Sequence, residues 1–296
     1  MRKGVILVAA LAVAVLAGGL WITRAVPLPE SAVAESAGDA AAGEQVFVAA
    51  GCASCHHAPE AEGDAKRVLA GGQRFPSDFG TFVAPNVSPH PEAGIGTWSL
   101  AQFASAVQRG VSPEGAHYYP AFPYTAYARM TAQDVADLWA FWQTLPPDAT
   151  PSAAHEVGFP FNIRRSLGVW KTLYLREDWV MEEVPDATVD RGRYLVEALA
   201  HCGECHTPRD ALGGLERDAW LGGAPNPNGR GTIPDLRPGA LDWSATDIAY
   251  YLESGFTPDF DSAGGHMVAV IENFAQLPAE DRAAVAAYLK ALPGGE

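Results

Sequence analysis

The chain has 296 residues, a formal net charge of −15 and only four cysteines. The negative charge argues against nucleic-acid binding, which needs a basic face. It favours docking on partners with basic patches, where opposite charge mainly raises the encounter rate. After an apolar N-terminus about 265 residues remain, which is enough for two small domains with separate cores.

Residues 1–29 predict a membrane anchor or a signal segment. An unbroken apolar run at residues 5–22 follows a basic start and is closed by Arg24. Its length is near the lower limit for a membrane span and exceeds the usual signal-peptide core of about 7–15 residues, so a retained anchor is favoured. A small-x-small pattern at residues 32–34 keeps a cleaved signal open. The basic start predicts a single-pass protein of the bacterial inner membrane, with its domains on the periplasmic side.

All four cysteines lie in two C-x-x-C-H motifs. The first motif contains Cys52, Cys55 and His56, and the second contains Cys202, Cys205 and His206. A zinc ribbon places its pairs about 15–20 residues apart, whereas these pairs are separated by roughly half the chain. A dithiol redox centre needs an alternating strand–helix pattern, which neither motif has. C-x-x-C-H is the attachment signature of haem c, in which two thiols bind the porphyrin and the histidine binds iron. The sequence therefore predicts two covalently bound haem c groups.

The chain contains an internal repeat. Each half has a short helix with glycine near its start, a C-x-x-C-H motif, a long Gly/Pro-rich loop, a middle helix and a terminal helix. The paired stretches are residues 43–56 and 192–206, 96–115 and 241–260, and 131–146 and 278–293. Apolar residues recur at three- and four-residue spacing in the helices, and neither half shows the two-residue alternation of a sheet.

Sequence signals also mark the ends of the two middle helices. Ser99 and Ser244 are suited to be N-caps, with a capping-box partner three residues later in each case. Gly110 and Gly255 stand where a helix ends in the left-handed conformation. The matching signals indicate that the two halves share one fold.

The predicted fold class is all-α: two tandem cytochrome c domains of the class I type after a single N-terminal transmembrane helix. The predicted boundaries are residues 30–42 for a flexible tether, 43–148 for the first domain, 149–186 for an interdomain segment and 187–296 for the second domain. The haem would form the centre of each core.

Each iron needs a ligand on the face opposite His56 or His206. Apart from the initiator and one interdomain methionine, the chain offers Met130 and Met267, one before each terminal helix. Methionine opposite histidine raises the reduction potential of a haem. The alternatives are a core role for either methionine, or ligation by His117 or His266, which would give a lower potential.

A carbonyl group near Pro59 or Pro208, just after each motif histidine, would accept a hydrogen bond from the imidazole Nδ1–H and fix the ring. Residues 159–175 combine aromatic and basic side chains. Two interpretations stay open for this segment: an interdomain clasp whose apolar side chains pack against both domains, or an amphipathic stretch on a membrane surface. In the clasp interpretation, Trp170 would support electron transfer between the haems.

Residues 79–131 resemble a known family. The elements "PNVSP", "GIGTW" and "YPAFPY" in this stretch are similar to those in cytochrome c subunits of membrane-bound periplasmic dehydrogenases, which oxidise alcohols, gluconate or sugars. The resemblance implies a carrier that takes electrons from a periplasmic dehydrogenase and passes them to quinone, an oxidase or a soluble cytochrome. There are two departures: such subunits commonly carry three haems, and some have methionine at the position of Phe122.

Two functions from different classes follow. The first is an electron carrier without a catalytic site, in which both irons are six-coordinate. The second is a dihaem redox enzyme, such as a peroxidase or a thiosulfate-oxidising cytochrome, which needs an open position at one iron. One methionine candidate per domain and the family resemblance favour the carrier.

Overall fold

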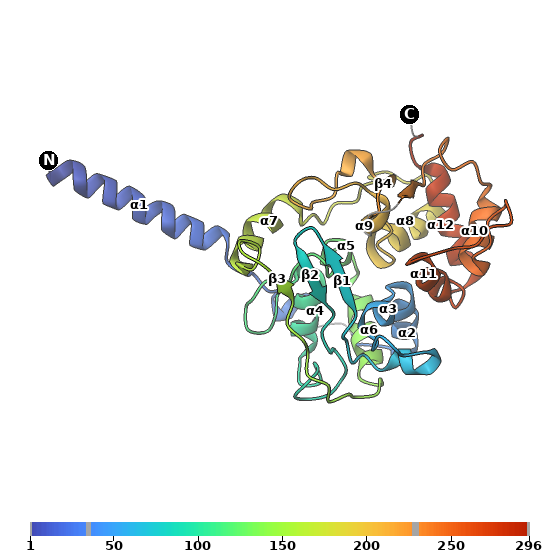
Figure 1. The fold of residues 1–296 in the computed structure, drawn as a ribbon, viewed down its shortest axis with the longest axis horizontal. Helices are drawn as coiled ribbons and strands as arrows, with labels where there is room; N and C mark the ends of the chain where they lie inside the picture. The colour runs from blue at the N-terminus through green and yellow to red at the C-terminus, as the bar shows by residue number, and fades with distance from the viewer. Residues whose placement is uncertain (1, 34–36, 227–230, 295–296) are drawn as a thin grey trace.

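The computed structural model describes residues 2–33, 37–226 and 231–294. Helix α1, Arg2–Ile22, projects away from the body of the molecule (Figure 1), and none of its residues is buried. With a mean hydropathy of 2.7 over its most apolar window, α1 is long and apolar enough to cross a membrane. A signal sequence would meet the same criterion, so the helix is consistent with both predictions for residues 1–29.

The first domain is a small helical bundle. Its helices are α2 (Ala40–Ala49), α3 (Cys52–His56), α4 (Leu100–Arg109), α5 (Tyr124–Tyr127) and α6 (Ala132–Trp142). Helices α2 and α6 cross at Gly43, where an added Cβ would lie 1.9 Å from the Asp137 carbonyl oxygen. Glycine at this position therefore permits the two backbones to touch.

The second domain repeats this arrangement. It contains α8 (Ala187–Tyr194), a π-helical turn (Leu195–Leu199), α9 (Gly203–His206), α10 (Ala245–Ser254), α11 (Met267–Phe274) and α12 (Ala279–Ala291). Helices α8 and α12 cross at Gly192, where a Cβ would lie 2.0 Å from the Ala284 carbonyl oxygen. The glycine near the start of each first helix thus has the same packing role in both halves.

The predicted ends of the middle helices are confirmed. Ser99 caps α4 and Ser244 caps α10, each through a complete capping box. Gly110 ends α4 with φ 58° and Gly255 ends α10 with φ 77°. Short 3₁₀ turns occupy Glu30–Ala32, Gly63–Arg67, Arg164–Ser166 and Arg217–Ala219.

The loops after the two motifs contain short antiparallel strands, which the all-α prediction missed. These are β1 (Arg74–Ser77) and β2 (Gly80–Val83) after the first motif, and β4 (Gly222–Pro225) and β5 (Thr232–Asp235) after the second. A further strand, β3 (Glu156–Val157), lies in the segment after α6 and pairs with β2. The strand order is β1-β2-β3 in one sheet and β4-β5 in the other. The strands have four residues at most and bury no alternating set of side chains, so the sequence carries no two-residue pattern there.

The stretch between α1 and α2 packs on the first domain. Leu28 donates its backbone N–H to Ser105 Oγ at 3.0 Å, and Val33 is buried in the core. Asp39 caps α2. Within the predicted tether of residues 30–42, residues 34–36 lie outside the described part of the chain. Of the described remainder Val33 alone is buried and residues 37–39 are exposed, while the Asp39 backbone N–H donates to Asp137 Oδ1 at 2.7 Å.

The segment between the domains contains α7, Leu167–Tyr174, and bonds to both domains through polar groups. Lys171 Nζ donates to the carbonyl oxygens of Arg109 at 2.6 Å and Gly110 at 2.7 Å, at the end of α4. Trp170 Nε1 donates to the Leu212 carbonyl oxygen at 3.0 Å. These bonds hold α7 against the end of α4 and against the loop after α9.

Most apolar side chains of this segment do not pack as the clasp interpretation predicts. Leu167 is buried, but Phe159 is 81% exposed, Phe161 46% and Leu173 48%. The predicted packing against both domains is therefore wrong for Phe159, whereas the Phe161 ring lies 5.0 Å from that of Phe79 in the first domain. The segment joins the domains by hydrogen bonds and turns much of its apolar surface outward.

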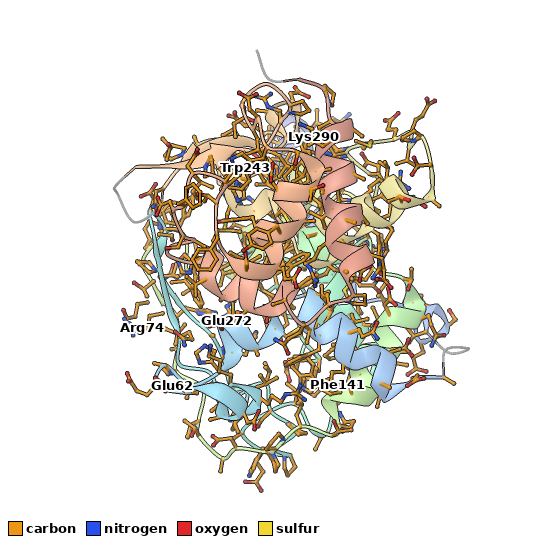
Figure 2. The ribbon with its side chains drawn as sticks, turned by 90° about the vertical axis from the view of Figure 1, so that its right-hand side faces the viewer. Glu62, Arg74, Phe141, Trp243, Glu272 and Lys290 are labelled. Atoms are coloured by element: carbon orange, nitrogen blue, oxygen red, sulfur yellow. The ribbon has the colours of Figure 1, made fainter. Side chains whose placement is uncertain are left out.

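The two domains meet along a continuous seam. Figure 2 shows Glu272 of α11 at the boundary, with Trp243 and Lys290 in the second domain above it and Phe141 in the first domain below. Lys66 of the first domain pairs with Glu272 at 2.7 Å. Buried residues of both domains belong to one hydrophobic cluster, so the domains pack as one unit.

Candidate haem sites

Each motif histidine is held by a carbonyl group from the loop that follows. His56 Nδ1 lies 3.0 Å from the Pro85 carbonyl oxygen, and His206 Nδ1 lies 2.9 Å from the Pro234 carbonyl oxygen. The predicted acceptors near Pro59 and Pro208 are wrong. The β1–β2 and β4–β5 hairpins instead fold Pro85 and Pro234 back onto the histidines, so that their carbonyl groups take this role. In the described part of the chain nothing bonds to Nε2 of either ring, which leaves that nitrogen for iron.

The four thiols fit haem attachment better than dithiol chemistry. None of them is in a disulfide. Burial raises the pKa of the Cys52 and Cys202 thiols to about 12. A dithiol redox centre lowers the pKa of its attacking cysteine instead. Two free thiols on one turn, followed by an imidazole with free Nε2, make a donor set that fits one haem c in each domain.

The two methionine candidates occupy different places in the repeat. Met130 is buried and lies two residues before α6, where the second domain has the buried Leu277 before α12. Met267 is half-buried and is the first residue of α11. It was expected in a loop, but the loop is shorter and ends in this helix. The isolated β-bridges Val111–His117 and Phe256–Ser262 correspond to each other in the repeat. Phe122 follows the first bridge by five residues and Met267 follows the second by five, so the two residues occupy equivalent positions.

The histidine alternatives differ in their surroundings. His117 is buried, and its Nε2 lies 3.1 Å from the Thr23 carbonyl oxygen at the end of α1. This bond ties His117 to the chain that follows α1, and the other ring nitrogen, Nδ1, is buried without a hydrogen-bond partner among the described residues. His266 is exposed and directly precedes Met267 on the chain.

The two C-x-x-C-H motifs face each other across the seam. Ser54, inside the first motif, accepts a hydrogen bond from Asn273 of α11 at 3.1 Å. Glu204, at the same place in the second motif, accepts one from Thr125 of α5 at 2.9 Å. Each motif is thus bonded to the helix that precedes the terminal helix of the other domain. This reciprocal arrangement places both haem-attachment sites at the domain interface.

Tyr127 of α5 lies between the motifs. Its hydroxyl group donates to the Ala50 carbonyl oxygen at 2.9 Å, just before the first motif. Its ring is 5.7 Å from that of His201, which directly precedes the second motif. Burial raises the pKa of Tyr127 well above its ordinary value, and the nearby Cys52 adds to the rise. The sequence analysis missed this role, because nothing in the local pattern marks Tyr127 as an interdomain contact.

Tyr127 is therefore a second candidate for the contact between the haem sites, and the role expected of Trp170 stays a prediction. We expect Tyr127→Ala to slow electron transfer between the domains severalfold, because it opens the packing between the motifs. The truncation should also destabilise the fold by about 3–5 kcal/mol. Tyr127→Phe, which keeps the ring, is the control and should retain most of the rate. Flash photolysis of the half-reduced protein measures the rate; equal rates for Tyr127→Ala and the wild type would contradict the expectation.

A buried carboxylate near the second motif was also missed. Glu197 is fully buried in the π-helical turn, five residues before Cys202, whereas the residue five positions before Cys52 in the first domain is Phe47. It accepts hydrogen bonds from the backbone N–H of Val180 at 2.6 Å and from the Tyr288 hydroxyl group at 2.7 Å. Since glutamate is common on exposed helix faces, its sequence position gave no signal of burial.

The fold and these sites define a class of protein: two small helical domains, each built to carry one covalently attached haem. The cytochrome c family model matches residues 40–146 and 189–293. The chain belongs to the cytochrome c family and binds two haem c groups. It is 56% identical to a dihaem c-type cytochrome of Cereibacter sphaeroides, over the full length of both chains.

Subunits of dehydrogenases are also similar to the chain. It is 38% identical to a fructose dehydrogenase cytochrome subunit of Gluconobacter japonicus, over 85% of this chain and 52% of the relative. It is 33% identical to a gluconate 2-dehydrogenase cytochrome c subunit of Pantoea cypripedii, over 84% of this chain and 58% of the relative. The chain thus spans about half the length of these dehydrogenase subunits.

Proposed function

We propose that this protein is a membrane-anchored dihaem electron carrier, which takes electrons from a periplasmic dehydrogenase and delivers them to the respiratory chain. Its own residues bind and orient the two redox groups and supply no catalytic site. Haem c supplies reversible one-electron chemistry when bound. The acceptor would be quinone, an oxidase or another cytochrome.

The observation that supports this proposal best is the reciprocal contact of the two motifs. Ser54 and Glu204, one inside each C-x-x-C-H motif, bond to the opposite domain. Redox groups attached at these motifs would stand close enough to exchange electrons within the chain, so that one domain can accept and the other donate. The similarity to dehydrogenase cytochrome subunits supports a dehydrogenase as the donor.

The membrane location rests on α1. This helix is exposed over its whole length, as a span in lipid would be, and two basic residues precede its apolar run. We propose that α1 is retained as a single-pass anchor of the inner membrane, with both domains on the periplasmic side.

The donor is tested in membranes of a strain that makes the protein and of a matched deletion strain. D-Fructose, D-gluconate and ethanol are added separately, and the absorbance of reduced haem c is followed. We expect at least one substrate to drive rapid reduction in the first strain. Oxygen uptake with that substrate should fall severalfold in the deletion strain. The same rates in both strains with every substrate would contradict the donor assignment.

The carrier and enzyme alternatives are separated by a redox titration of the purified full chain, with and without carbon monoxide. Two high-potential steps and no carbon monoxide binding are expected if both irons have a methionine ligand. Ready carbon monoxide binding by one haem would instead show an open position and favour a dihaem redox enzyme.

A further inference from the structure

An exposed apolar surface lies beside the end of α1. We call it the clasp face and define it by Phe159, Phe161, Ile163, Val169 and Leu173. Phe159 is 81% exposed, and Val169 and Leu173 are each nearly half exposed. The last two stand four residues apart on α7 and so share one side of that helix. The opposite side carries Leu167 and Lys171, which are buried against the domain.

The clasp face is fixed directly to the end of α1. Arg165, in the turn that precedes α7, donates to the carbonyl oxygen of Leu20 at 2.5 Å and to Thr23 Oγ1 at 3.0 Å. At Gly168 the backbone of α7 touches that of Thr23, since an added Cβ would lie 2.5 Å from the Thr23 Cα. Figure 1 shows α7 and β3 at the point where α1 leaves the body.

The end of α1 has the composition of a membrane–water boundary. Trp21 is 66% exposed, and the Arg24 guanidinium group lies over its ring at 3.5 Å. Tryptophan is enriched at both membrane–water interfaces, and an arginine near the end of a membrane-spanning helix extends its charged group towards the interface. Since Arg165 and Gly168 contact residues 20–23, the clasp face stands at the same level as this boundary.

Charge also favours a lipid surface at this place. The chain as a whole carries a net charge of −15, which repels anionic lipids. Arg164 and Arg165 form a local basic site on the segment that carries the clasp face, and Glu156 and Glu177 nearby are paired with Arg74 and Arg109. Exposed apolar side chains beside arginines are typical of segments that lie in the interface of a bilayer.

We propose that the clasp face lies on the outer surface of the bilayer and orients both haem domains relative to the membrane. The proposal rests on the proposed anchor role of α1. Two rigid contacts with the bilayer, one by α1 and one by the clasp face, would hold the domains in one orientation, whereas α1 alone would let them rotate. The second domain, whose α10 is at the opposite end of the molecule in Figure 1, would then point away from the membrane.

The test uses the full haem-loaded chain in vesicles of phosphatidylcholine and phosphatidylglycerol, with one added cysteine that carries a nitroxide. Val169→Cys places the label on the clasp face. Tyr250→Cys on α10 is the matched control, because Tyr250 is 55% exposed and also lies on a helix. For each label, the collision rate of the nitroxide with oxygen, which enters lipid, is compared with its collision rate with a nickel chelate, which stays in water.

We expect the ratio of oxygen to nickel collisions to be severalfold higher for Val169→Cys than for Tyr250→Cys. Equal ratios in protein that floats with the vesicles would overturn the clasp-face proposal and leave the anchor standing. A label that loses access to nickel only when a dehydrogenase is added would also overturn it, because the surface would then belong to a protein partner. If the chain does not float with the vesicles, the anchor fails and the proposal fails with it. Reduction by a dehydrogenase in solution would still test the electron-carrier role separately.

Discussion

Met130→Leu is expected to lower the reduction potential of the first haem and to let that haem bind carbon monoxide. The thioether sulfur is removed while the buried side chain keeps its volume, so stability should change by less than about 1.5 kcal/mol. Because axial ligands set haem potentials over a range of about 0.8 V, the fall should be on the order of 0.1 V or more. Redox titration followed at the haem absorbance measures it.

The internal repeat supplies controls for this experiment. Leu277 is the residue of the second domain that corresponds to Met130 of the first. The two side chains are almost equally buried, with exposed fractions of 5% for Leu277 and 4% for Met130. Leu277→Met should therefore leave both potentials close to those of the wild type, while Met267→Leu should lower only the second. If Met130→Leu changes neither potential nor carbon monoxide binding, Met130 is a core side chain. In that case the first iron lacks a methionine ligand, since Phe122 stands where the second domain has Met267.

Local signals in the sequence predicted the helical plan of both domains. The capping boxes at Ser99 and Ser244 and the left-handed glycines depend on residues within one turn, so they can be recognised without tertiary information. Both C-x-x-C-H motifs are equally local. The repeat strengthened these predictions, because the same signals occur at corresponding places in each half.

Features that depend on long-range folding were missed or misplaced. The carbonyl groups that hold the motif histidines come from Pro85 and Pro234, 29 and 28 residues after the histidines they hold. Two hairpins bring them back, and hairpins this short have no periodic pattern. The exposure of Phe159, 81%, was misjudged for a related reason: an aromatic side chain is usually taken as buried, and its direction depends on the tertiary fold.

The buried carboxylate of Glu197 should be a main determinant of stability in the second domain. We expect Glu197→Ala to lower the free energy of unfolding by about 3–5 kcal/mol, because the truncation leaves buried hydrogen-bond donors without an acceptor. These donors are the backbone N–H groups of Val180 and Met181 and the Tyr288 hydroxyl group. Thermal unfolding of the haem-loaded protein should show a midpoint lower by about 10 °C, as each kcal/mol corresponds to about 2–4 °C for a chain near this size.

Two further variants separate the loss of the acceptor from the loss of packing. Glu197→Gln keeps the volume and one acceptor oxygen, so its effect should lie between those of Glu197→Ala and the wild type. Tyr288→Phe removes one donor to Glu197 and should cost about 1–2 kcal/mol, since the hydroxyl group also accepts a bond from Trp220 at 3.0 Å. Equal losses for Glu197→Gln and Glu197→Ala would mean that both carboxylate oxygens are needed as acceptors, since Val180 donates to Oε2 and Tyr288 donates to Oε1. If Glu197→Ala unfolds at the wild-type temperature, the carboxylate does not hold the segment before α8 to α12, and the hydrophobic core of the domain maintains the fold without it.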